Sequence, residues 1–336
     1  MTKPQYVIVT GTSAGGISAL SEFVAHLDPG MDAAVFIVMH LSRTSISDFL
    51  MLRLQPFTTL PCTIASNEAV IEKGHIYIAA ANLHLIVKED RMLLRQGPEE
   101  NRWRPSVDVL FRSAGAAWNT HCIAVVLTGL LDDGTAGMLA VKKSGGSCIV
   151  QHPDEAEFPD MPLSVLDNME VDFCITLSAM GKIISDICHS VRTSIAAPRE
   201  VRLEAEIAER VIVDYEHVKQ LGDKSIYACP DCGGGLWHIN EDSHGRKRVD
   251  RYRCHIGHSY SEKDLVIKQA EIAENTLWVA LRIMEERKTL LMKMQADHIK
   301  KGLSVIAGKY GAKAEAISIH VDKLKEILFA AQEIDK

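Results

Sequence analysis

The sequence lacks the features that mark a membrane-spanning, secreted or nucleic-acid-binding protein. None of its apolar runs approaches the ~18–20 residues that a helix needs to cross a bilayer, and its first residues, MTKPQYVIVTG, carry no secretory cleavage pattern. Basic charge does not prevail either, because 37 Lys and Arg residues stand against 44 Asp and Glu, a formal net charge of −7 at pH 7. We therefore expect a cytoplasmic protein with no membrane insertion and no nucleic-acid partner.

Two phosphate-binding motifs are also missing from the glycine-rich turn VTGTSAGG at residues 9–16. A dinucleotide-binding fingerprint needs a glycine where Ser13 stands, and no G-K-[ST] ends the turn as in a Walker A loop. Anion binding by the amides of the following helix remains an alternative. The pattern better fits G-x-S-x-G between a strand and a helix, in which small residues allow a sharp turn that lifts a nucleophilic serine above the sheet edge.

What the sequence does contain, over residues 5–195, is an alternation of short apolar runs with helical patterns. The runs QYVIVT, AAVFIVM, IAVVLTG and SCIVQ are nearly all apolar, as expected of parallel strands that are buried on both faces. Patterns such as GISALSEFVAHL and VDVLFRSAGAAW separate them. The alternation predicts an α/β domain with a doubly wound, mostly parallel sheet. Residues 62–96 interrupt it with short alternating pieces, which predict inserted β-hairpins.

A serine nucleophile needs a base and an orienting acid. Both are expected after strands, because sites in open α/β sheets lie at the carboxyl ends of the strands. His40 follows AAVFIVM and His152 follows SCIVQ. His40 is favoured, because its strand comes directly after the serine's own helix and is expected beside the first strand. The candidate acids, Asp132 and Asp133, follow IAVVLTG, and for one of them a role as cap of the next helix is the alternative.

Several separated stretches resemble the catalytic domain of the CheB family of chemotaxis protein-glutamate methylesterases: GTSAGG, VMHLS, PEENRWRPSVDVLFRSAG, VVLTGLLDDGTAGM and FPDMP, within about residues 4–192. The resemblance implies Ser13 as nucleophile, His40 as general base and Asp133 as orienting acid, with no cofactor for catalysis. It implies hydrolysis of glutamyl γ-methyl esters on the helical cytoplasmic region of chemoreceptors, with release of methanol, and deamidation of receptor glutamines. It also points to residues that contact the substrate or shape its cleft: Thr12, Arg102, Arg104 and Met161. A structural ion pair is the alternative for Arg104.

Two departures from the family pattern bear on activity and control. Members often have TGMGNDG where this chain has TGLLDDG, so Leu131 stands in place of a glycine near a backbone amide that is a candidate oxyanion donor. The first strand begins at about residue 5, which predicts a form without the N-terminal receiver domain. Regulation of the enzyme's activity is then expected to be absent or to come from elsewhere.

Cysteine and histidine residues cluster in YACPDCGGGLW and RYRCHIGHSY, between residues 227 and 260. CPDCG is a zinc-knuckle pattern, and the 21 residues between its second cysteine and Cys254 are a usual zinc-ribbon spacing. We predict a structural zinc ion bound by Cys229, Cys232, Cys254 and His258. His255 is the alternative fourth ligand, and a redox disulfide between the first two cysteines is the alternative chemistry.

The sequence therefore predicts four segments. They are a catalytic domain at 1–195, a charged helical linker at 196–222, a zinc-ribbon-like module at 223–260, and a helical region at 261–336 that resembles a hairpin with a break near residues 302–311. The helical region is a candidate surface for other chemosensory proteins. The alternative to an esterase is a non-enzymatic chemosensory scaffold that acts through the zinc module and the helical tail.

Overall fold

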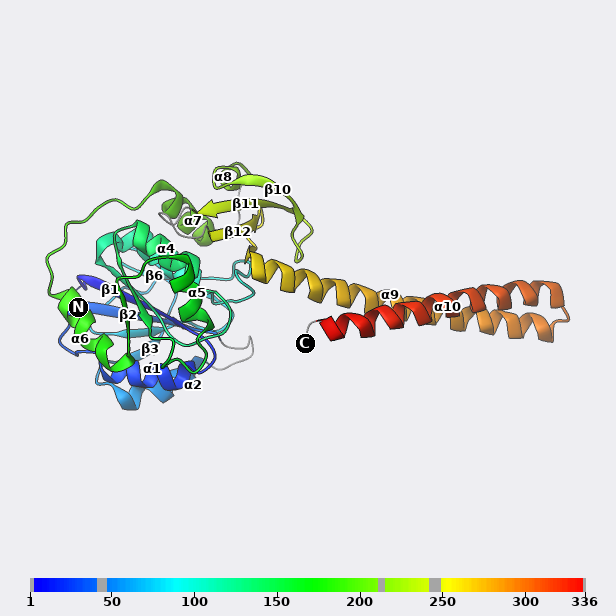
Figure 1. The fold of residues 1–336 in the computed structure, drawn as a ribbon, viewed down its shortest axis with the longest axis horizontal. Helices are drawn as coiled ribbons and strands as arrows, with labels where there is room; N and C mark the ends of the chain where they lie inside the picture. Colours follow the sequence, from blue (N-terminus) through cyan, green and yellow to red (C-terminus); the bar gives the residue numbers. More distant parts are fainter. Residues whose placement is uncertain (1–2, 41–46, 211–214, 242–248, 335–336) are drawn as a thin grey trace. The chain divides into compact units, whose positions relative to one another are not determined.

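The computed structural model describes residues 3–40, 47–210, 215–241 and 249–334. The chain divides into two compact units, residues 1–264 and 265–336. The first unit contains an α/β part and a smaller antiparallel sheet, and the second consists of helices (Figure 1). Within the described ranges, none of the helices is both long and apolar enough to cross a bilayer.

The α/β part is built on one sheet with the strand order β3-β4-β2-β1-β7-β8-β9, and all neighbouring strands in it are parallel. The chain continues from β1 to β2 on one side and returns later to β7 on the other, so the topology switches at β1. A switch point leaves a crevice at the carboxyl ends of the strands beside it. The strands are β1 Tyr6–Thr12, β2 Ala33–Met39, β3 Cys62–Ile64, β4 Ile76–Ile78, β7 Cys122–Val126, β8 Ser147–Gln151 and β9 Phe173–Ile175.

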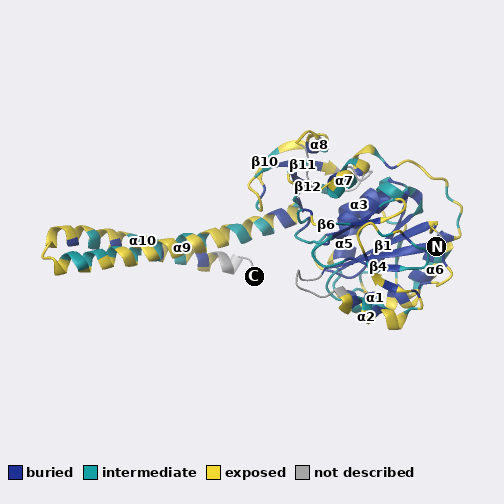
Figure 2. Ribbon diagram, turned by 180° about the vertical axis from the view of Figure 1, so that it is seen from behind, coloured by how far each residue is buried: buried dark blue, intermediate teal, exposed yellow. Residues whose placement is uncertain are grey.

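Helices cover both faces of this sheet, which confirms the doubly wound α/β prediction (Figure 2). Val7 and Val9 of β1 belong to a core with α3, α4 and α5, whereas Tyr6 and Ile8 belong to a core with α1, α2 and α6. Because successive side chains of a strand point to opposite faces, a strand between two cores is buried at every position and nearly all apolar. The helices are α1 Gly16–Ala25, α2 Ser47–Leu54, α3 Val107–Trp118, α4 Thr135–Lys143, α5 Asp160–Asn168 and α6 Leu177–Cys188, with the short 3-10 helices η1 Gln55–Phe57 and η2 Asn119–His121.

The hairpins predicted over residues 62–96 are only partly correct. β3 and β4 pair in parallel, with Cys62 opposite Ile76, and extend the main sheet. In the described part of this region the antiparallel hairpin consists of β5 His84–Val87 and β6 Met92–Arg95. Short strands at a sheet edge show the same alternation as hairpin strands, whereas the direction of pairing depends on the route of the chain between them.

A smaller sheet, β10-β11-β12-β13, lies in the same unit and is antiparallel throughout. Its strands are β10 Asp223–Ala228, β11 Gly235–Glu241, β12 Val249–Cys254 and β13 Ser259–Ser261. We call residues 223–261 the Cys/His module. Two helices precede it, α7 Arg199–Arg210 and α8 Tyr215–Lys219. Helix α7 packs against α3, so the segment predicted as a linker contributes to the packed structure of the first unit.

Two long helices, α9 Glu262–Lys300 and α10 Ser304–Ile334, make up the C-terminal part of the chain. Ser261 caps α9, because its hydroxyl accepts a hydrogen bond of 3.1 Å from the Asp264 amide. In the second unit the helices share a core that includes Leu281 and Val321. The break between them is shorter than predicted, at residues 301–303, since Gly308 and Gly311 lie inside α10.

Candidate active site

Ser13 lies in a tight turn between β1 and α1, at the carboxyl edge of the sheet. Its amide donates to the Thr128 carbonyl at 3.1 Å, and its own carbonyl accepts from the Gly16 amide at 3.0 Å. Gly15 has φ +73°, a left-handed backbone conformation that residues other than glycine adopt only at a cost in free energy. A Cβ on Gly16 would lie 2.6 Å from Oγ1 of Thr12. The glycines predicted to allow a sharp turn are therefore required by its geometry, and Ser13 is left half-buried.

His40 and Asp133 form a buried hydrogen-bonded pair, although 93 residues separate them in sequence. Nε2 of His40 lies 2.7 Å from Oδ2 of Asp133, and the two side chains are 0% and 2% exposed. His40 directly follows β2, and its amide donates to the Thr12 carbonyl at 3.1 Å. Nδ1 of His40 is buried and has no hydrogen-bond partner among the described residues. The bond to the carboxylate places the ring proton on Nε2 and leaves Nδ1 as the basic nitrogen.

The Asp133 carboxylate sits at the N-terminus of α3, where free backbone amides favour a negative charge. Besides His40, it accepts from the Val107 and Asp108 amides at 2.7 and 3.1 Å, and from the Ser106 hydroxyl and the Asn101 side-chain amide, both at 3.0 Å. Burial raises the pKa of Asp133, but the hydrogen bonds from His40, Val107 and Asn101 outweigh burial and hold the pKa below its ordinary value. The carboxylate is thus ionised and fixed in orientation.

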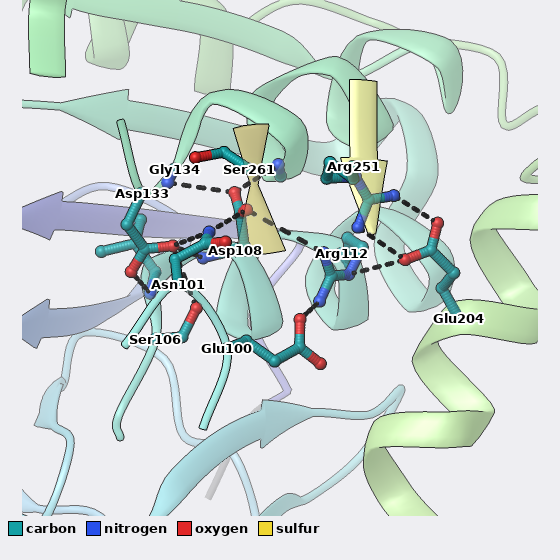
Figure 3. Close-up of polar contacts among 12 residues, drawn as sticks. Glu100, Asn101, Ser106, Asp108, Arg112, Asp133, Gly134, Glu204, Arg251 and Ser261 are labelled. Atoms are coloured by element: carbon teal, nitrogen blue, oxygen red, sulfur yellow. Dashed lines mark hydrogen bonds and ion pairs between the residues drawn. The ribbon is translucent and has the colours of Figure 1, made fainter. Parts of the chain in front are cut away.

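Asn101 joins two carboxylates beneath the site (Figure 3). Its Nδ2 donates to Asp133 and, at 2.8 Å, to Asp108, whose other oxygen accepts from the Gly134 and Gly137 amides. Burial and the nearby charge of Asp133 raise the pKa of Asp108 to about 7. The sequence analysis assigned no role to Asn101, although it belongs to the stretch NRWRPSVDVLF on which the family resemblance rested.

Trp103 is a second residue that sequence reasoning missed. Its ring stacks on His40 with centroids 4.3 Å apart and planes 7° from parallel. The preceding residues, Asn101 and Arg102, have φ of 50° and 68°. Two successive left-handed residues turn the chain sharply. This turn places Asn101 beside Asp133 and Trp103 beside His40.

Ser13, His40 and Trp103 line one cavity of about 1400 Å³, together with Arg102 and the turn formed by Leu130 and Leu131. Leu131 has φ +67°, the left-handed conformation expected where the family pattern has glycine. Charged residues of both signs complete the lining of the cavity: Glu22, Arg53, Glu157 and Asp160.

The other three residues predicted to contact the substrate are not among the described residues that line this cavity. Thr12 is buried, and its hydroxyl donates to the Thr128 carbonyl at 2.7 Å. Arg104 bonds to Asn82 and to the Gly97 carbonyl at 2.6 Å. Met161 is fully buried against Gly129. Their roles in substrate binding remain predictions.

The alternative base and acid lie elsewhere. His152 follows β8, as predicted, but its imidazole is half-exposed and accepts from the Asp154 amide at 3.3 Å. Asp132 adjoins Asp133, and its carbonyl accepts from Thr135 at the start of α4. The structure therefore pairs His40 with Asp133.

The Cys/His module brings together the thiols of Cys229, Cys232 and Cys254 and the imidazole of His258, whose ligand atoms all lie within 4.8 Å of one another. The Sγ atoms of Cys232 and Cys254 are 3.7 Å apart, and Sγ of Cys254 lies 3.5 Å from Nδ1 of His258. A tetrahedral zinc ion, with bonds of ~2.3 Å to sulfur and ~2.0 Å to nitrogen, separates two sulfurs by about 3.8 Å and a sulfur and a nitrogen by about 3.5 Å. The four residues thus fit a metal ion.

Residues 8–184 match the family model described as CheB methylesterase. A candidate protein-glutamate methylesterase/protein-glutamine glutaminase of Leptospira interrogans is 32% identical over 177 residues, which are 52% of this chain and 91% of that protein. The protein-glutamate methylesterase/protein-glutamine glutaminase of Geobacillus kaustophilus is 34% identical over 191 residues, and this chain spans only 54% of its length.

Among solved structures, the CheB methylesterase catalytic domain of Thermotoga maritima matches with a TM-score of 0.53 and 26% identity, over 54% of this chain and 98% of that one. The matched residues contain Ser13, His40 and Asp133 and end before α7. The family model covers more than half of the sequence, and this chain therefore belongs to the CheB methylesterase family.

Proposed function

We propose that this protein is a serine esterase that hydrolyses glutamyl γ-methyl esters on chemoreceptors, and that the same apparatus deamidates receptor glutamines. The observation that carries the proposal is the buried 2.7 Å hydrogen bond between His40 and Asp133 beside a cavity that Ser13 also lines. The names of the relatives support both the ester and the amide chemistry. A serine hydroxyl is a weak nucleophile by itself, so the neighbouring base is essential.

In the first half of the reaction, Oγ of Ser13 attacks the ester carbonyl while Nδ1 of His40 takes the hydroxyl proton. The ionised Asp133 stabilises the imidazolium that forms. We propose the amides of Ala14 and of the Leu130–Leu131 turn as donors to the oxyanion, because these residues line the cavity beside Ser13. The carbon–methoxy bond then breaks, and the imidazolium returns its proton to the leaving oxygen, which departs as methanol.

In the second half, His40 takes a proton from water, and the hydroxide attacks the glutamyl–Ser13 ester. Collapse of the second tetrahedral intermediate breaks the bond to Oγ, which regains its proton from the imidazolium. The products are a free glutamate side chain and the original enzyme. With glutamine as substrate, the same steps release ammonia in place of methanol.

The rim of the cavity suits a protein substrate. Phe57 and Leu130 are 51% and 45% exposed and line the cavity opening together with Ile17. Exposed apolar side chains around a polar site favour contact with a protein surface over a small polar ester. Arg102 adds a cation to the lining and remains our candidate for contact with the acidic surroundings of a receptor glutamate.

We further propose that Cys229, Cys232, Cys254 and His258 hold a structural zinc ion. Four protein ligands leave no open position, so the ion would supply folding energy to the Cys/His module and take no part in ester hydrolysis. The separations of 3.7 and 3.5 Å between ligand atoms support a tetrahedral site.

Methanol release from methylated chemoreceptor membranes tests the esterase directly. We expect the full chain to release methanol, and the Ser13→Ala variant to lose at least ~10³-fold in rate, because removal of the nucleophile leaves only binding and oxyanion stabilisation. Ser178→Ala, on the exposed face of α6, is the matched control and should keep full activity. Equal release by the wild type and Ser13→Ala would overturn the mechanism.

A further inference from the structure

Five charged side chains are buried together where the Cys/His module meets the α/β part: Glu100, Arg112, Glu204, Arg251 and Arg253. Each is at most 6% exposed. Oε1 of Glu100 accepts from Arg253 at 2.6 Å, and its other oxygen accepts from Arg112. Glu204 accepts from Arg251 at 2.7 and 3.1 Å (Figure 3). Buried charges are tolerated only when they are paired in this way, so the cluster fixes the module against α3 and α7.

The contact between the Cys/His module and the α/β part also includes the short loop Glu100–Trp103. The Asn101 amide donates to the carbonyl of Ser259, on β13 of the module, at 2.9 Å. Within the loop, the amides and carbonyls of Glu100 and Trp103 bond to each other at 3.0 and 3.3 Å. The loop is therefore closed on itself and held to the module at two points, through the Glu100 side chain and the Asn101 backbone.

This loop is also the part of the chain that orients the catalytic pair. Asn101 donates to Asp133 at 3.0 Å, and Trp103 stacks on His40 at 4.3 Å. On the module side, Arg253 directly precedes Cys254 and Ser259 directly follows His258, and the Cys254 amide donates to the His258 carbonyl at 3.0 Å. The two anchors of the loop are thus immediate neighbours of two residues of the Cys/His cluster.

We propose that the Cys/His module positions the active site, with Glu100 and Arg253 as positioning residues that hold the loop Glu100–Trp103 against Asp133 and His40. The proposal rests on the proposed esterase function for its kinetic readout. Metal binding by the Cys/His residues of the module would then control the alignment of His40 and Asp133 without contact with the substrate. A shift of about 1 Å at catalytic groups is enough to lower a rate by ~10²-fold.

The kinetic test compares Glu100→Gln with Glu204→Gln in the full chain. Both changes remove one negative charge from the buried cluster of five charged side chains. Among the described residues, however, Glu204 bonds to arginines and to no residue of the loop. We expect Glu100→Gln to lower kcat by ~10- to 100-fold with KM changed less than twofold, and Glu204→Gln to keep kcat while losing thermal stability. An unchanged kcat in folded Glu100→Gln, or an equal loss in both variants, would overturn the proposal.

A second readout needs neither substrate nor mutation. The proton shared by His40 and Asp133 gives a downfield proton resonance that reports the alignment of the pair. In the wild-type protein, we expect chelation of zinc to broaden or shift this resonance while the far-ultraviolet circular dichroism of the α/β part persists, and added Zn²⁺ to restore it. A resonance unaffected by metal removal would contradict the proposal. If the wild type released no methanol, the esterase function would fail, yet this measurement would still decide the positioning role.

Discussion

The ring of Trp103 lies flat against the imidazole of His40, 4.3 Å from centroid to centroid, and both residues line the cavity. The contact joins residues 63 positions apart, and it covers one face of the base without occupying either ring nitrogen. An aromatic face next to an imidazolium stabilises its positive charge, and in the proposed mechanism His40 carries that charge while it holds the proton of Ser13.

Replacing Trp103 with leucine should therefore lower kcat more than it affects KM. A cation–π contact contributes about 0.5–2 kcal/mol, which corresponds to a loss of roughly 2- to 30-fold. Trp103→Phe should retain most of the rate. Trp118→Phe serves as a control, because Trp118 is buried beside Lys88 and away from the cavity. A kcat for Trp103→Leu equal to that of the wild type would show that the stacked ring has no part in catalysis.

Leu131→Gly should stabilise the protein. Leu131 has φ +67°, a conformation that costs a residue with a Cβ about 1–2 kcal/mol, whereas glycine adopts it freely and loses ~0.5–1 kcal/mol in chain entropy. We expect the free energy of unfolding, measured with denaturant, to rise by about 0.5–1 kcal/mol. Leu130→Gly, at the exposed neighbouring position, should lower it. A decrease for both variants would mean that the side chain of Leu131 contributes more by packing than its backbone costs.

Acid should destabilise the protein through the buried charge cluster. Burial raises the pKa of Glu204, but Arg251 and Arg112 outweigh burial and lower it to about 2; Arg112 and Arg253 likewise hold the pKa of Glu100 well below its ordinary value. A carboxyl group whose pKa is lower in the folded state contributes stability above its unfolded pKa of ~4.3, and this stability is lost as the pH falls toward the folded value. The free energy of unfolding should therefore fall steeply between about pH 4.5 and 2.

Glu204→Gln isolates that contribution. The variant should be less stable than the wild type at pH 7, and its free energy of unfolding should depend less on pH below 4.5. Glu206→Gln, exposed on the same helix, should follow the wild-type curve. Parallel pH dependences for Glu204→Gln and the wild type would place the acid sensitivity elsewhere.

Elemental analysis of gently purified protein should find about one zinc ion per chain. Cys232→Ser removes one of the four ligands and should lower the zinc content and the stability of the Cys/His module. Cys174→Ser is the matched control, because Cys174 lies on β9, outside the cluster. Zinc-free wild-type protein, or full zinc content in Cys232→Ser, would refute the proposed site.

Local patterns were enough for much of the fold and part of the site. β1 and β2 are buried at every position because each lies between two cores, so their apolar runs YVIV and AAVFIVM were visible as strands without the structure. The glycines around Ser13 and the spacing of Cys229 and Cys232 are properties of single turns. His40 was selected for its place at the end of the strand beside β1, and β2 does pair with β1.

Other features arise from contacts between distant segments, and no local pattern encodes them. The parallel pairing of β3 with β4 depends on how the chain returns to the sheet edge. Asn101 and Trp103 stand in a polar stretch with no periodicity, and they join the site only because a left-handed turn and the start of α3 bring them to Asp133 and His40.

By itself, the sequence determined the α/β alternation, the serine turn and the Cys229–Cys232 pair of the Cys/His module, because each depends on neighbouring residues and on which side chains need burial. Only the tertiary structure decided which histidine meets Asp133 and that Arg253 of the Cys/His module pairs with Glu100 of the loop Glu100–Trp103. The residues in those two contacts lie 93 and 153 positions apart in the sequence. A polar side chain buried away from water is costly unless it bonds to a partner, and only the complete fold brings these partners together.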